Sequence, residues 1–253
     1  MKSYLKFNIK RFIYFIKSIF TRSKKKNVKI SYIVERKNWA IRWDGINISR
    51  NINLKSKKPI IDIENFPYSS RKSRIIHFGS QYMWLDFVDY IPKKHKVVVN
   101  FYHGKKDDGD SVKSHIDKFL ENTYRLDKIL TASSLVERRL IKWGIERRKI
   151  VKIPIGVDTS LFKIFDQKKQ IKLREEFKFE KDDLIIGSFQ KDGVGWGKGK
   201  IPKYIKGPDV FVETVSLLSK KFKVAVLLTG PARGYVIDQF KKRKIKYRHI
   251  FLD

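Results

Sequence analysis

Seven short runs of apolar and β-branched residues recur along this 253-residue chain, and they constrain its fold more than any other feature. Several of them lack the polar alternation of a half-exposed strand, which is typical of strands buried on both faces of a parallel sheet. Stretches with helical spacing separate them, so the sequence predicts an α/β protein with parallel sheets. The predicted strands are residues 28–34, 74–78, 96–102, 128–132, 149–154, 184–189 and 223–229.

Helical spacing marks several segments between and after these strands. Ser134 and Glu137 have the spacing of a capping box at the start of one segment, and Gly144 is suited to end it. Pro208 suits the first turn of another helix. The predicted helices are residues 116–126, 135–144, a stretch that begins at Pro208, and 235–244.

The segment 155–183 breaks this rhythm with a turn, a charged helical stretch and an acidic end. We interpret it as the join between two α/β domains, which we place at residues 27–162 and 163–253. About five predicted strands fall in the first domain and two in the second. Sheets average ~5–6 strands, and a two-stranded sheet cannot bury its helices alone. The second domain is therefore predicted to be incomplete in this chain.

The charge balance is strongly basic, with 58 Lys and Arg against 26 Asp and Glu and a formal net charge of +32. The basic residues are spread along the whole chain, and no zinc finger, helix-turn-helix or RNA-binding aromatic motif accompanies them. We therefore expect no specific nucleic-acid partner. The absence of cysteine excludes disulfides and thiolate metal sites, while a hydrophobic fraction of 42% suffices for a packed core.

Residues 1–26 form a basic segment in which bulky apolar residues recur at helical spacing among lysines and arginines. The segment has no uninterrupted apolar stretch of the ~20 residues that a membrane span needs. Two interpretations are open: a helix that lies in the interface of an anionic membrane, or an ordinary helix packed on the domain. We favour the first, which places the protein in the cytoplasm at the inner face of the membrane.

The segment 187–209 is rich in glycine and lysine and lies between a predicted strand and the helix at Pro208. It matches neither the dinucleotide-binding glycine pattern nor a P-loop. Glycine allows close backbone approach, and a helix N-terminus after a basic loop favours anions. The segment is therefore either a phosphate-binding loop or a solvated surface loop.

Residues 128–162, KILTASSLVERRLIKWGIERRKIVKIPIGVDTSLF, resemble the domain-closing segment of retaining GT-B glycosyltransferases, the sugar-nucleotide-dependent enzymes of the family 4-like group. The Lys206–Gly207 pair before a helix and the glycine turn in LLTGPARG (227–234) resemble parts of their second domain. The resemblance extends over roughly residues 95–234. It implies an α/β fold with two Rossmann-like domains of a GT-B architecture. The matching positions of the first segment are Thr131, Ser133, Ser134, Gly144, 150–153, Pro154, Gly156, Val157, Asp158 and Phe162.

The resemblance implies an enzyme that moves a hexosyl unit from a nucleoside diphosphate sugar to a polysaccharide or lipid-linked acceptor, with retention. Neither a cofactor nor a metal is expected. The glutamate-bearing loop of these enzymes would lie beyond Asp253, so we expect a fragment or a truncated protein that is inactive alone. The alternative is a noncatalytic basic α/β module at the membrane that binds a nucleotide or a polyanion.

The resemblance also implies the donor phosphate contacts, which are Lys206 and Gly207. The alternative for Lys206 is one solvated lysine among many. The family pattern places an arginine near the end of the preceding strand, where this chain has Ser188 to Lys191. Lys191 is the candidate replacement, although lysine lacks the bidentate fork of arginine. Gly187 and Gly230 are expected to line the cleft.

In the first domain, His103 and Gly104 follow an apolar strand. The resemblance implies that His103 is the catalytic candidate, a group that contacts the transferred sugar or assists its geometry, and that Gly104 lines the cleft. A hydrogen-bonded loop histidine is the alternative. The nearby acidic residues 107, 108 and 110 predict a solvated turn. His77 also follows a strand, but no role is assigned to it.

The segment 35–49 contains two tryptophans and an Asp44–Gly45 pair. Aromatic faces here would suit an acceptor pocket for sugar rings. An Asp-Gly pair equally predicts a hairpin turn packed by the tryptophans, and we favour the hairpin.

Overall fold

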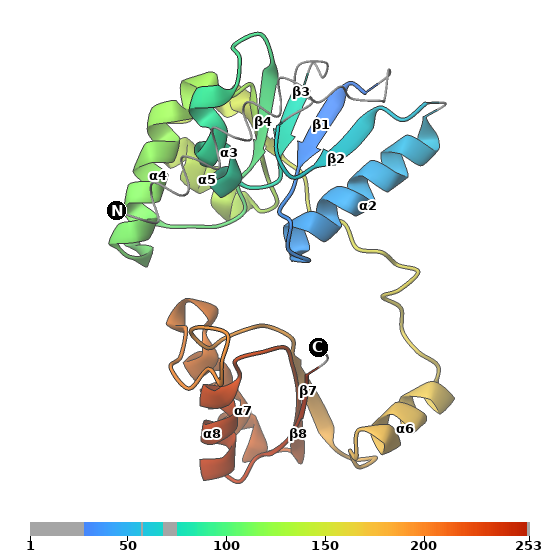
Figure 1. Ribbon diagram of the computed structural model, residues 1–253. Coiled ribbons are helices and arrows are strands. Elements are labelled where there is room, and N and C mark those ends of the chain that lie inside the picture. The colour runs from blue at the N-terminus through green and yellow to red at the C-terminus, as the bar shows by residue number, and fades with distance from the viewer. Residues whose placement is uncertain (1–27, 57, 68–74, 252–253) are drawn as a thin grey trace. The chain divides into compact units, whose positions relative to one another are not determined.

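The computed structural model describes residues 28–56, 58–67 and 75–251, and the predicted amphipathic segment 1–26 lies outside them. The chain divides into two compact units, one that ends at Gly156 and one that begins at Val157. Both have a parallel sheet and are α/β, as predicted (Figure 1). The predicted division at residue 162 lies a few residues after the one that the structure gives.

The first unit is built on a six-stranded parallel sheet with the order β2-β1-β3-β4-β5-β6. The chain therefore steps from β1 to one side for β2 and to the other side for all later strands. This reversal makes the gap between β1 and β3 the topological switch point of the sheet. The strands are β1 (Ile30–Ile33), β2 (Ile61–Glu64), β3 (Ile75–Phe78), β4 (Lys96–Asn100), β5 (Lys128–Thr131) and β6 (Ile150–Lys152).

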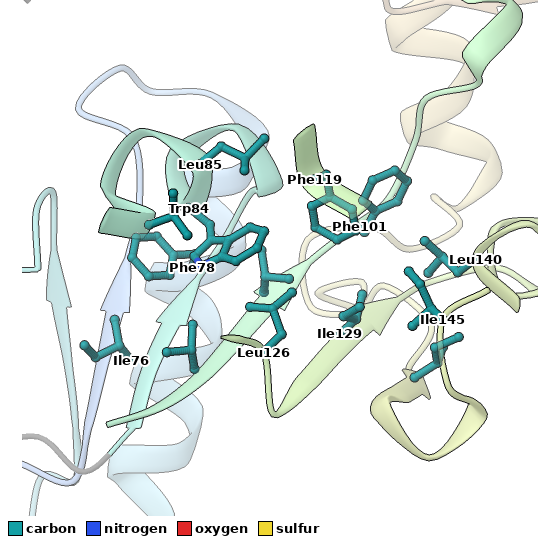
Figure 2. Close-up of a cluster of buried hydrophobic side chains, with 14 of the residues drawn as sticks. Ile76, Phe78, Trp84, Leu85, Phe101, Phe119, Leu126, Ile129, Leu140 and Ile145 are labelled. Atoms are coloured by element: carbon teal, nitrogen blue, oxygen red, sulfur yellow. The ribbon is translucent and has the colours of Figure 1, made fainter. Parts of the chain in front are cut away.

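Aromatic and aliphatic side chains of β3, β4 and β5 form the main core with helices α3 (Gln81–Phe87), α4 (Asp110–Asn122) and α5 (Ser134–Lys142) (Figure 2). Phe119 lies at the centre, with its ring 5.4 Å from Trp84 and 4.9 Å from Phe101 between centroids. A separate apolar cluster of Tyr32, Val34 and Ile61 packs near helix α2 (Ala40–Lys55).

Helix α2 corrects the prediction of a hairpin at Asp44–Gly45, because both residues lie inside this helix. A Cβ atom on Gly45 would lie 2.5 Å from Val34 Cγ1 and 3.0 Å from Tyr32 Cε1. Glycine is therefore needed for the close approach of α2 to β1 rather than for a turn. Tertiary packing outweighs the local turn preference of the Asp-Gly pair.

Gly45→Ala is expected to lower the free energy of unfolding of the first unit by about 1–3 kcal/mol, the usual cost of overpacking a core. Alanine would otherwise favour an exposed helix by up to ~1 kcal/mol over glycine, so the sign of the change is informative. Urea denaturation followed by circular dichroism measures it. Asn47→Ala, at an exposed position of the same helix, is the control. A Gly45→Ala variant as stable as the wild type would contradict this packing.

The ends of α5 test the capping prediction. The N-cap is Ser133, whose side chain accepts a hydrogen bond from the Val136 amide, so the capping box predicted at Ser134 is wrong by one residue. Glu137 instead forms ion pairs with Arg147, at 2.8 Å, and with a lysine of β6. Gly144 has a φ of +87° and ends the helix, as predicted.

The second unit contains a three-stranded parallel sheet with the order β7-β8-β9, one strand more than predicted. Its strands are β7 (Leu184–Ser188), β8 (Val224–Thr229) and β9 (Lys246–Ile250). Its helices are α6 (Gln167–Glu176), α7 (Pro208–Ser219) and α8 (Gly234–Lys242), and Pro208 occupies the first turn of α7 as predicted. Val215, Val226 and Phe240 are fully buried between α7, α8 and the sheet.

Candidate functional site

The glycine- and lysine-rich segment after β7 is an ordered hairpin in the structure. The Val194 amide donates to the Ile201 carbonyl at 2.9 Å, and the Lys203 amide donates to the Asp192 carbonyl at 2.7 Å. We call residues 192–203 the glycine hairpin. Its backbone is thus paired with itself before any ligand arrives.

The glycines of this hairpin serve close packing against the turn between β8 and α8. Cβ atoms on Gly193 or Gly199 would overlap the backbone of Ala232, and one on Gly234 would overlap the Lys198 carbonyl. The Gly234 amide also donates to that carbonyl at 2.8 Å. These positions therefore require glycine for the contact between two loops. Gly195 and Gly197 have open space around them instead.

A buried ion pair fastens the glycine hairpin to the sheet. Arg233 Nη2 lies 3.2 Å from Asp192 Oδ2, and both side chains are fully excluded from solvent. Arg233 also donates to the Ser188 hydroxyl at 2.8 Å and to the carbonyls of Ser188, Gln190 and Thr229. Burial raises the pKa of the Asp192 carboxyl, and the Arg233 guanidinium opposes that shift. One side chain thus joins the carboxyl ends of β7 and β8 to the hairpin.

Sequence reasoning missed this ion pair, and no local pattern marks it. The guanidinium reaches the end of β7, where the resembled family has an arginine, but it arrives from the turn after β8. Because it is buried and donates to backbone carbonyls, its role in this structure is to fix the loop.

The Lys206–Gly207 pair lies at the entry to α7. Lys206 ends a short 3₁₀ turn, is exposed, and has no ion-pair partner among the described residues. Gly207 has a φ of +63°, a left-handed conformation that favours glycine, and it is the N-cap of α7. The side-chain Nε2 of Gln190 donates to the Lys206 carbonyl at 2.9 Å, which ties this turn to the segment that follows β7. An exposed ammonium and the first turn of a helix therefore lie together.

The other predicted donor-site residues also lie near the carboxyl ends of β7 and β8. Gly187 is exposed within β7, and Gly230 follows β8 with a φ of +83° and open space where a side chain would be. Lys191 Nζ lies 3.8 Å from the centre of the Trp196 ring, so a cation–π contact within the loop engages its charge. This edge of the sheet is where ligands bind in open α/β folds.

In the first unit, His103 is exposed just beyond the carboxyl end of β4. Its backbone carbonyl accepts a hydrogen bond from the side-chain Nε2 of Gln81 at 3.4 Å, and the Gly104 carbonyl accepts one from the Arg139 guanidinium at 2.9 Å. Gly104 has a φ of +117°. The backbone of this loop is therefore fixed, and the exposed imidazole lies 6.3 Å from the Tyr82 ring between centroids.

His77 is part of a buried network. Its Nε2 lies 2.8 Å from Asn100 Oδ1, and the Asn100 amide donates to the Tyr32 hydroxyl at 3.0 Å. Burial lowers the pKa of His77 to about 4, so the ring is neutral at physiological pH. The network joins the ends of β1, β3 and β4 beside the switch point.

Two half-buried carboxylates, which the sequence did not single out as a pair, lie near the same edge. Glu35 follows β1 and Asp44 belongs to α2. Burial raises the pKa of both groups. Burial, together with the charge of Asp44, raises the pKa of Tyr102 to about 12. Polar groups therefore gather at the switch point of the first sheet.

The described residues contain neither a metal-binding cluster nor a membrane-spanning helix. No group of three or more His, Cys, Asp or Glu side chains is placed to hold a metal ion in that part of the chain. None of the helices described is both long enough and apolar enough to cross a bilayer. Of the acidic residues after His103, Asp107 and Asp108 lie in a 3₁₀ turn and Asp110 begins α4. Asp108 Oδ2 accepts a hydrogen bond from the Lys105 backbone amide at 2.9 Å.

No family model and no curated protein matches the sequence. Solved structures do match the fold. The structure of Anabaena Alr3699/HepE in complex with UDP and glucose superposes with a TM-score of 0.67 at 13% identity, over 89% of this chain and 70% of that one. This chain has a GT-B-like fold.

A second neighbour agrees with that fold. The lipopolysaccharide outer core galactosyltransferase WaaB, in its apo form, matches with a TM-score of 0.51 at 11% identity. The match covers 89% of this chain and 68% of WaaB. The predicted class of two Rossmann-like units is therefore confirmed, while identities this low support the GT-B-like fold alone.

Proposed function

We propose that the protein is a glycosyltransferase that moves a hexosyl unit from a nucleoside diphosphate sugar to a polysaccharide or lipid-linked acceptor, with retention. One observation carries the proposal: the exposed Lys206 and the Gly207 turn at the N-terminus of α7, at the carboxyl edge of the second sheet. The shared fold with HepE, which was solved with UDP and with UDP-glucose, supports it.

The chemistry of this position suits a leaving diphosphate. Negative charge grows on the diphosphate as its bond to the sugar breaks, and preorganised positive groups stabilise that charge. The Lys206 ammonium supplies a full charge, and the N-terminus of α7 supplies a partial one. The left-handed Gly207 puts no side chain between them and the ligand. Lys191, Gly187 and Gly230 complete the proposed donor edge.

The first unit would hold the acceptor side of the reaction. We assign His103 to contact with the transferred sugar or to its orientation, because its ring is exposed on a fixed loop at the end of β4. The leaving phosphate would help to remove the acceptor proton, so the proposal nominates no side-chain nucleophile. Neither a cofactor nor a metal is part of it.

A panel of nucleotide sugars tests the function. The chain is titrated with UDP-glucose and related donors, and binding is followed by calorimetry, a readout that does not depend on turnover by this chain alone. Binding of a nucleotide sugar that Lys206→Ala weakens supports the proposal. Salt-dependent binding to any polyanion, without nucleotide preference, favours the noncatalytic alternative instead.

We also propose that residues 1–26 hold the protein on the inner face of the cytoplasmic membrane, since bulky apolar groups and anionic-lipid attraction act together there. Deletion of these residues is expected to reduce binding to anionic vesicles about tenfold or more, at ~1 kcal/mol per basic residue near the surface. Vesicle co-sedimentation measures the change, and circular dichroism checks that the remainder is folded. Equal sedimentation of the trimmed protein at physiological salt would refute this assignment.

A further inference from the structure

A basic pocket lies at the amino ends of β4 and β5, on the sheet edge opposite to His103. It has a volume of about 430 Å³, within the ~300–1,000 Å³ range of small-ligand sites. Its walls are the loop that leads into β4, residues 91–97, and the connection that leads into β5, residues 124–127. Neither wall belongs to the donor edge of the second unit.

The charged lining of this pocket is strongly one-sided. Lys93, Lys94, Lys96 and Arg125 line it, with Asp127 as the acidic side chain among the lining residues. The Asp127 carboxylate accepts a hydrogen bond from the Val97 amide at 2.7 Å, so one of its oxygens is already engaged. Over the described ranges, none of the three lysines forms an ion pair. Arg125 is paired with Asp89 at 3.7 Å, so the three lysines are the uncompensated cations of this lining.

The pocket walls are fixed in place before any ligand binds. Arg125 donates to the Ile91 carbonyl at 3.1 Å, which joins the two walls. The His95 amide donates to the Pro92 carbonyl at 3.2 Å and closes a tight turn that presents the lysines. A backbone that is already ordered loses less entropy on binding than a mobile one.

The rest of the lining is apolar and aromatic. Trp84, Val88 and Leu126, which belong to the buried core, close the pocket from inside. Trp84 and Leu126 are both labelled in Figure 2. Tyr124 stands at the rim with 73% of its surface exposed. The pocket therefore offers an aromatic surface beside a cluster of ammonium groups.

We propose that this pocket binds an organic phosphate, with the phosphate against Lys93, Lys94 and Lys96 and the apolar body against Tyr124. A phosphate monoester carries up to two negative charges and several acceptor oxygens, which suits several lysines better than a single carboxylate does. The same chemistry belongs to a soluble phosphate ester and to a lipid phosphate headgroup. The site is independent of the proposed transferase activity.

Calorimetric titration of the full chain with phenyl phosphate and with inorganic phosphate tests the site. Phenyl phosphate is expected to bind more tightly than inorganic phosphate, and Tyr124→Ala is expected to remove that preference. The triple variant Lys93→Gln/Lys94→Gln/Lys96→Gln should bind phenyl phosphate at least about tenfold more weakly, because charge-assisted contacts are lost. The matched control is Lys168→Gln/Lys172→Gln/Lys181→Gln, which removes the same charge from exposed positions of the second unit.

Competition identifies the source of the phosphate. Displacement of phenyl phosphate by vesicles with phosphatidic acid, but not by phosphatidylcholine vesicles, indicates a lipid headgroup. If neither kind of vesicle displaces phenyl phosphate, the ligand is a soluble phosphate ester. Absence of phenyl phosphate binding by the wild type, or equal weakening in both triple variants, would overturn the proposal.

Discussion

Arg233→Met is expected to lower the free energy of unfolding of the second unit by about 3–5 kcal/mol, the usual cost of removing one partner from a buried ion pair. The Asp192 carboxylate would remain buried without its counter-charge, and the hairpin would lose its link to Ser188 and Thr229. Chemical denaturation measures the loss. Trp196, the only tryptophan after residue 156, is a fluorescence reporter within the hairpin itself.

The control for Arg233→Met is Arg243→Met, which breaks an exposed ion pair with Glu213 at 3.0 Å in the same unit. Exposed pairs contribute about 0–1 kcal/mol, so a small loss is expected there. The double variant Arg233→Met/Asp192→Leu should regain much of the stability, because no uncompensated charge stays buried. Equal losses for Arg233→Met and Arg243→Met would contradict the role of the buried pair.

Lys206→Ala is expected to weaken UDP binding by about 10- to 150-fold, which corresponds to a charge-assisted hydrogen bond of roughly 1.5–3 kcal/mol. Binding of uridine, which lacks the diphosphate, should change much less. Calorimetry on both ligands separates the two effects. Because Lys206 is exposed, the substitution is not expected to disturb the fold.

Lys220→Ala provides a matched control for Lys206→Ala. Lys220 is an exposed lysine at the opposite end of α7. Each of the two variants loses one positive charge, so their net charges are equal. Screening at physiological salt should keep its effect on UDP affinity small. If Lys206→Ala and Lys220→Ala bound UDP equally well, general charge rather than a phosphate contact would explain the affinity.

The strands that the sequence predicted correctly are apolar runs, and they include the edge strands β6 and β7. The two missed strands, β2 and β9, are edge strands whose sequences IDIE and KYRHI mix charged and apolar residues. An edge strand is half exposed and carries charges that discourage pairing with other chains, so its pattern resembles a loop. Strand prediction from apolar runs therefore fails where an edge strand mixes charged with apolar residues.

The candidate site was predictable only where its parts are local in sequence. Lys206, Gly207 and Pro208 are consecutive, and the turn-to-helix geometry follows from glycine and proline preferences. The Arg233–Asp192 pair and the packing of Gly199 on Ala232 join segments that are far apart in the chain. Such contacts depend on the tertiary fold, and no single-segment pattern marks them.

The most direct test of the donor site is an amide NMR titration of the full chain with UDP. Binding at the proposed edge should shift the amides of Gly187, Gly207 and Gly230, and it should leave the amino ends of β7 and β8 unchanged. In the same titration, Lys206→Ala should need UDP concentrations at least about tenfold higher than the wild type to show these shifts. Shifts confined to the first unit, or none at saturating UDP, would contradict the placement of the nucleotide.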